Sequence, residues 1–197
     1  CYLLTNVSCK YGGSVSNYMQ CMNATKKGIH SATVALNGVS DTLDCEGYRL
    51  PTESEWEYAI RAGSNTAFYP SDGNNGTITY TGTDPVDPNL DQIAWFGGNN
   101  TPSGSKSVGG KEANAWGLYD MSGNASEWVW DTYEAAYPSG TVASPLVDPS
   151  PGSGLYRVWR GGKYSSSASY CRSARRQWSE PYYRDTHLGF RLVRNAD

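Results

Sequence analysis

The stretch "GYRLPTESEWEYAIRAG", residues Gly47–Gly63, carries the clearest helix signal in the chain. Thr52 is a favoured N-cap residue, and Glu55 stands three residues later, where a capping box places its acidic partner. Gly63 is a residue type that commonly follows a helix end. Apolar residues at helical spacing define one face, namely Trp56, Ala59 and Ile60. We expect a helix of about three turns that packs this face against a core.

Further along the chain, several blocks alternate apolar and polar residues, as strands do. "NAWGLYDMSGNASEWVWD" covers residues 114–131, "YRVWRGG" covers 156–162 and "LGFRLVR" covers 188–194. The last two blocks predict half-buried strands. They enclose residues 163–187, which we expect to be a displayed loop region held on a rigid frame.

The composition favours a loop-rich domain and excludes several classes of protein. The chain has 197 residues with seven Trp, fifteen Tyr and 22 Gly, so we expect ring packing and backbone hydrogen bonds to hold an irregular fold. A net charge of −3 argues against a dedicated nucleic-acid-binding protein. No apolar run approaches the roughly 20 residues that span a bilayer, so we expect no transmembrane segment.

The N-terminal segment is rich in cysteine and poor in apolar residues. Of the five cysteines, four fall within the first 45 residues: Cys1, Cys9, Cys21 and Cys45. Disulfides would restrict the unfolded state of such a segment, and they indicate an exported protein, extracellular or at the cell surface. Three pairings are possible and all remain open. Zinc is the competing interpretation, which the lack of a CxxC pair in the sequence disfavours.

Taken together, the blocks from Gly47 to Arg194 resemble the formylglycine-generating-enzyme (sulfatase-modifying factor) family. The resemblance implies a C-type-lectin-like fold of the α+β class, irregular, with a small twisted antiparallel sheet, few helices and long loops. We expect a single domain over residues 1–197. Within it, residues 1–46 are the disulfide-linked N-terminal segment and residues 47–197 are the family core.

The resemblance also implies an oxidase chemistry that this sequence does not reproduce. Oxidases of the family hold copper between two cysteines of the C-terminal segment, because Cu(I) prefers thiolate ligands. Here that segment has one cysteine, Cys171, and serines occupy residues 165–167. We therefore expect Cys171 to be a packing residue and the protein to be no oxidase. A copper-dependent oxidase that uses Cys171 with an unrecognised partner is the alternative, and a structural surface or filament subunit is a third hypothesis.

Calcium is the cofactor that the sequence favours, in a structural role. Asp120 and Glu127 lie seven residues apart, and the turn between them has the length to gather two carboxylates and two carbonyls round one hard cation. The resemblance implies that a first site uses these side chains with the carbonyls of Gly123 and Ala125. It implies a second site for which the matching residues are Asn89, Leu90, Asn100 and Pro102.

Residues 163–187 have the composition of a binding surface. Tyrosine and tryptophan give large contact areas with few rotatable bonds, and serine adapts its hydrogen bonds. The candidate contact residues are Tyr164, Ser166, Ser169, Tyr170, Arg176, Trp178, Tyr182, Tyr183, Asp185 and His187. We expect about half of them to be exposed and to contact a protein or glycan ligand. The segment also resembles the variable region of proteins diversified by retroelements, and its residue types permit such diversification without demonstrating it.

Overall fold

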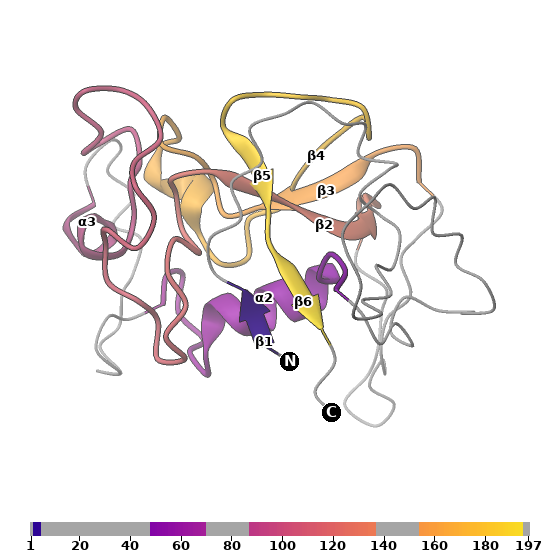
Figure 1. Cartoon of the computed structure of the whole chain (residues 1–197), viewed down its shortest axis with the longest axis horizontal. Coiled ribbons are helices and arrows are strands. Elements are labelled where there is room, and N and C mark those ends of the chain that lie inside the picture. The colour runs from indigo at the N-terminus through magenta and orange to yellow at the C-terminus, as the bar shows by residue number, and fades with distance from the viewer. Residues whose placement is uncertain (1, 5–47, 70–86, 137–153, 195–197) are drawn as a thin grey trace, which may run out of the picture.

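The computed structural model describes residues 2–4, 48–69, 87–136 and 154–194 (Figure 1), and for residues 2–4, 88 and 89 it describes the backbone alone. Cys1, Cys9, Cys21 and Cys45 lie outside these residues, so their bridging stays a prediction.

A four-stranded sheet forms the centre of the described structure. Its strands are β2 (Ser126–Thr132), β3 (Arg157–Arg160), β4 (Gln177–Ser179) and β5 (Leu188–Phe190), in the order β4-β3-β2-β5. The β2–β3 and β3–β4 pairs are antiparallel, whereas β5 runs parallel to β2. The α+β, C-type-lectin-like class with few helices is thereby confirmed, and the small sheet is mixed rather than wholly antiparallel.

A second, two-stranded sheet joins distant parts of the chain. Strand β1 (Tyr2–Leu4) pairs antiparallel with β6 (Leu192–Arg194). A bridge between Arg49 and Val193 adds the residues just before the predicted helix to the other side of β6. The predicted "LGFRLVR" strand is therefore split: its first half extends the central sheet and its second half holds the small one.

The predicted helix is α2 (Glu53–Arg61), and it crosses beneath the central sheet (Figure 1). Thr52 is its N-cap, and the capping box with Glu55 is complete. Trp56 and Ile60 are fully buried, as the apolar spacing predicts. The helix ends where Ala62 and Gly63 take left-handed conformations. The N-terminal signals and the apolar face thus sufficed to place this element.

A helix after Asp87 was not expected from the sequence. Helix α3 (Pro88–Ile93) begins after Asp87, whose carboxylate accepts the Leu90 amide at 3.3 Å. An Asp followed by Pro is a helix-start signal, since Asp caps the free amides and Pro suits the first helical position.

The hydrophobic core lies between α2, α3 and the sheet, and Cys171 belongs to it. The core residues are Trp56, Ala59, Ile60, Phe68, Tyr69, Leu90, Ile93, Ala94, Phe96, Leu118, Met121, Val129, Val158, Ala168 and Cys171. Six of these fifteen residues come from outside the helices and strands, so loops also contribute to this core. Among the described residues, no helix is long and apolar enough to cross a membrane.

The region between β3 and β5 is more ordered than the loop expected there. It contains a short 3₁₀ helix, η3 (Ala168–Cys171), and strand β4, which pairs with β3. Residues 163–187 therefore run outward from the end of β3, pair with β3 again through β4, and lead into β5.

Candidate functional site

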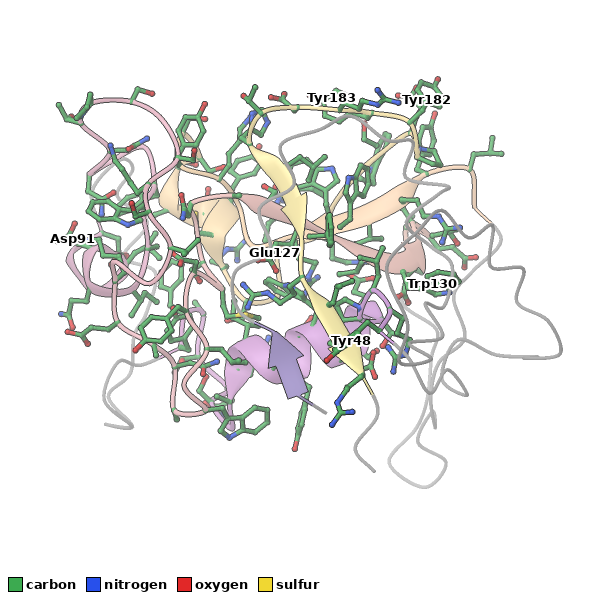
Figure 2. The ribbon with its side chains drawn as sticks, viewed as in Figure 1. Tyr48, Asp91, Glu127, Trp130, Tyr182 and Tyr183 are labelled. Carbon is green, nitrogen blue, oxygen red and sulfur yellow. The ribbon has the colours of Figure 1, made fainter. Side chains whose placement is uncertain are left out.

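Glu127 is a buried carboxylate that accepts three side-chain hydrogen bonds. Arg191 donates from Nε to its Oε2 and from Nη2 to its Oε1, both at 2.5 Å. The indole of Trp56 donates to Oε2 at 2.8 Å. Burial on its own would lower the pKa of Arg191, but the Glu127 carboxylate raises it above its ordinary value. The ion pair joins β2 to the residue between β5 and β6, and the indole hydrogen bond adds α2 to the same carboxylate. Figure 2 labels Glu127 in the interior of the described structure.

This pairing bears on the first predicted calcium site. A guanidinium that contacts both oxygens of Glu127 neutralises it and repels a second cation. The other acid, Asp120, accepts the Gly109 amide through Oδ2 at 2.7 Å. Among the described residues, no three His, Cys, Asp or Glu side chains gather where they would bind a metal. The set of Asp120, Gly123, Ala125 and Glu127 therefore fits calcium poorly.

The second predicted set is mixed in its fit. The Asn100 side-chain Oδ1 is buried and accepts no hydrogen bond, whereas its Nδ2 donates to the Tyr164 carbonyl at 3.1 Å. An orphaned buried oxygen is a suitable ligand for a hard cation. Against this, the Leu90 carbonyl accepts the Ala94 amide, and the Pro102 carbonyl accepts the ammonium of Lys106. The side chain of Asn89 lies outside the described residues.

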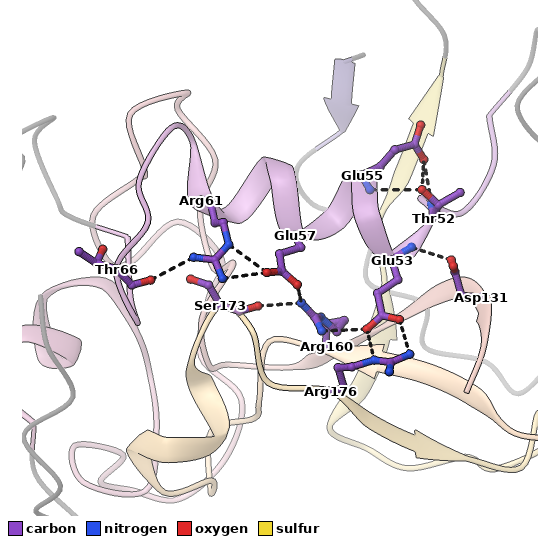
Figure 3. A network of polar contacts seen from close by, with 10 residues as sticks. All are labelled: Thr52, Glu53, Glu55, Glu57, Arg61, Thr66, Asp131, Arg160, Ser173 and Arg176. Atoms are coloured by element: carbon purple, nitrogen blue, oxygen red, sulfur yellow. Dashed lines mark hydrogen bonds and ion pairs between the residues drawn. The ribbon is translucent and has the colours of Figure 1, made fainter. Parts of the chain in front are cut away.

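Two arginines clamp the displayed region to α2 (Figure 3). Arg160 is fully buried and donates to Glu53 at 2.8 Å, to Glu57 at 2.5 Å and to the Ser173 carbonyl at 2.8 Å. Arg176 holds both oxygens of Glu53, at 2.7 and 2.8 Å. The Arg176 side chain is 13% exposed, so this candidate contact residue serves the frame instead.

The N-terminus of α2 is held from the sheet by Asp131. Its Oδ2 accepts the Glu53 amide at 2.6 Å, next to the two arginines of the clamp. Burial raises the pKa of Asp131 to about 6, although the amide that it accepts favours the charged form. Asp131 thus adds a third carboxylate to the junction of helix, sheet and displayed region.

Cys171 occupies the core as a packing residue, as expected. Its side chain is fully buried, and its carbonyl accepts the Ser122 hydroxyl at 3.1 Å. A Cβ on Gly162, which has φ +73°, would lie 2.7 Å from the Cys171 Sγ. The sulfur is thus enclosed by the tight backbone at "RGG", which explains why a glycine is needed there.

The displayed region presents aromatic rings to solvent. Of the ten predicted contact residues, Tyr170, Trp178, Tyr182 and Tyr183 are exposed, and the side chains of Tyr182 and Tyr183 stand at the top of the loop before β5 (Figure 2). Tyr164, Ser169, Asp185 and His187 are partly buried. Ser166 is 8% exposed and accepts the Lys163 amide, so it lies in the frame rather than on the surface.

Two aromatic residues that the sequence analysis missed extend this surface. Tyr156 and Tyr133 pack on the Trp178 ring, with centroids 4.5 and 5.3 Å away. Tyr156 opens the block "YRVWRGG" and directly precedes β3, which places it next to Trp178 of the paired strand β4.

A polar chain joins the two ends of the displayed region. The Tyr183 hydroxyl donates to Asp185 at 2.8 Å, and Asp185 lies 2.6 Å from Nδ1 of His187. Lys163, which the sequence analysis did not single out, places its Nζ 2.8 Å from Nε2 of His187. Lys163 follows the end of β3 and His187 directly precedes β5, so the two residues are far apart in the sequence and meet only in the folded chain.

Comparison with known proteins gives the chain its relatives. The family model described as the sulfatase-modifying factor enzyme 1-like domain matches residues 8–196. A formylglycine-generating enzyme of Thermomonospora curvata is 34% identical over 157 residues, which are 75% of this chain and 49% of that protein. The chain thus spans about half the length of the curated relative it matches.

Solved structures agree with this match. Treponema denticola variable protein 1 has a TM-score of 0.62 and 36% identity, over 76% of this chain and 48% of that one. PvdO from Pseudomonas aeruginosa has a TM-score of 0.56 and 28% identity, over 75% of this chain and 52% of that one. The similarity therefore covers about three quarters of this chain and about half of each solved structure.

Proposed function

Because the chain belongs to the sulfatase-modifying factor enzyme 1-like domain family, we propose that it is a non-catalytic member, which binds a protein or glycan ligand through residues 163–187. The observation that carries the proposal is the place of Cys171. It is the one cysteine of that segment, and the core encloses it completely. The segment offers solvent its aromatic rings instead of a thiol.

The chemistry of a copper-dependent oxidase explains why Cys171 distinguishes an oxidase from a binding protein. A two-coordinate copper centre needs a second thiolate within reach of the first. Ser165, Ser166 and Ser167 supply hydroxyls, which are hard and protonated ligands. The solved variable protein with the same fold supports a role in display, and the formylglycine-generating enzymes among the relatives keep the oxidase as the second candidate.

The proposal predicts that binding depends on the exposed rings of the displayed region. We expect the variant with Tyr170, Trp178, Tyr182 and Tyr183 all changed to serine to lose at least about tenfold in affinity, because buried aromatics dominate most interfaces. The measurement is binding to a glycan array and to a panel of purified extracellular proteins. Tyr58 and Trp116, 68% and 47% exposed and packed on each other away from this surface, provide the matched control.

The control variant, with Tyr58 and Trp116 changed to serine, is expected to bind as the natural chain does. Equal loss in both variants would indicate general stickiness and overturn the proposal. The same preparations are incubated with Cu(I) and a sulfatase-type cysteine peptide, beside the Thermomonospora curvata enzyme. Aldehyde formation that disappears in Cys171→Ala would establish the oxidase in place of the binding protein.

We also propose that calcium, where it binds this domain, does so at the second set, through the orphaned oxygen of Asn100. Asn100→Asp removes the Nδ2 donor to Tyr164, so in chelator we expect a loss of about 1 kcal/mol. Its added charge should make calcium raise the melting temperature more than in the natural chain. Identical melting with calcium and with chelator, in both proteins, would remove calcium from this site.

A further inference from the structure

The contact between Lys163 and His187 fixes the proton positions of the polar chain. An ammonium has no lone pair, so Lys163 is the donor and Nε2 of His187 is the acceptor in their 2.8 Å contact. The imidazole proton then lies on Nδ1 and is donated to Asp185 at 2.6 Å. His187 is therefore neutral in this arrangement, in a single tautomer held from both sides.

Lys163 carries a positive charge with spare donors. Within the described residues, the Lys163 Nζ has no carboxylate within ion-pair distance. One of its three N–H groups donates a hydrogen bond to His187, and two remain for other acceptors. Lys163 and Asp185 are the charged groups placed against the imidazole, and the Tyr164 ring meets it edge-on at 6.2 Å. Burial and then Lys163 lower the pKa of His187, whereas Asp185 raises it.

We propose that Lys163 and His187 form a subsite for an anionic oxygen of the ligand, which enters between Nζ and Nε2 while His187 takes up one proton. The anion is a carboxylate or a sulfate group, as an acidic protein or an acidic glycan presents it. The subsite requires that the ligand of the displayed region carry an acidic group, so this inference rests on the proposed function.

The coupling follows from the geometry of the contact. Protonated His187 has a donor at both nitrogens, so the 2.8 Å contact with an ammonium becomes repulsive. An anionic oxygen between the two nitrogens accepts from both and removes the repulsion, while Asp185 keeps its hydrogen bond from Nδ1. Proton and anion therefore bind together, and each strengthens the other by the same factor.

The sign of the pH dependence is fixed by this linkage. The free site has a His187 pKa below its ordinary 6.5, and a bound anion raises it. Between these two pKa values, the affinity for the anion increases by up to about tenfold for each unit that the pH falls. Well above 6.5 the subsite retains the attraction of Lys163 alone.

Histidine NMR tests the proposal directly, because the chain has two histidines, His30 and His187. The pKa of each ring is measured at constant ionic strength in chloride, sulfate and acetate, with His30→Gln for assignment. We expect sulfate or acetate at saturation to raise the pKa of His187 by about one unit and to leave His30 unchanged. A rise with acetate alone identifies the carboxylate source, and a rise with sulfate alone identifies the sulfate source.

Variants separate a built subsite from general charge screening. Lys163→Met should abolish the anion-dependent shift, and Lys111→Met, which removes an ammonium elsewhere, should retain it. No shift in either salt, or equal shifts of both histidines, overturns the subsite. If the shift is found but the aromatic variant binds its ligand normally, the subsite stands and the proposed binding surface fails.

Discussion

Replacing Arg191 with methionine is expected to lower the free energy of unfolding by about 3–5 kcal/mol, because it leaves Glu127 charged and buried without its cation. Glu127 and Arg191 are 8% and 6% exposed, and two hydrogen bonds of 2.5 Å join them. Methionine fills a similar volume, so a cavity contributes little to the loss. Urea unfolding followed by tryptophan fluorescence measures the change.

A second variant separates the charge from the packing. Arg191→Met combined with Glu127→Leu removes both charges, and we expect it to recover a large part of the lost stability, since a buried ion pair and an apolar pair of similar size differ little. If Arg191→Met alone cost less than about 1 kcal/mol, Glu127 would have another cation in solution, and the first calcium set would regain support.

Replacing Gly123 with alanine is expected to be as damaging, with a loss of about 4 kcal/mol or failure to fold. Gly123 has φ +74°, and a Cβ there would lie 2.2 Å from the Trp95 carbonyl oxygen. The obstacle is backbone that itself forms a bridge with Gly123, so it has no room to move aside. The melting temperature and near-ultraviolet circular dichroism report the effect.

Two glycines elsewhere provide matched controls. Gly117 has φ +75°, but a Cβ there would have no atom within 4 Å, so its alanine variant carries the conformational cost alone, about 1 kcal/mol. Gly189 has neither feature, and its alanine variant should be near neutral. A Gly123 variant no less stable than the Gly117 variant would mean that the backbones of Gly123 and Trp95 separate easily.

Local signals in the sequence predicted the position of some elements, whereas contacts between distant segments could not be predicted from it. Helix α2 was predictable because Thr52, Glu55 and the apolar spacing all lie within one segment. Helix α3 has a start signal in Asp87 and the following proline, but the helix has only six residues, which is too short to show an apolar periodicity. The parallel pairing of β5 with β2 joins Ser126 to Leu188, and no spacing rule reports such a partner.

The candidate site divides along the same line. The exposure of Trp178 and Tyr182 agrees with a composition suited to binding. The same composition misassigned Arg176, because its partner Glu53 lies 123 residues away. Glu127 was singled out for its spacing from Asp120, while the cation it meets, Arg191, is 64 residues downstream. Charged side chains choose partners in three dimensions, so residue type alone could not assign their roles.

During synthesis, β2 leaves the ribosome well before β5, its parallel neighbour. A nascent chain that has reached β3 holds Glu127 without Arg191 and Trp56 without a closed core. Such high-sequence-separation contacts delay folding, since loop closure must precede the gain from burial. The apolar and aromatic residues of the nascent domain therefore stay without their final partners until Arg191 has emerged, an interval in which exposed apolar surface favours aggregation.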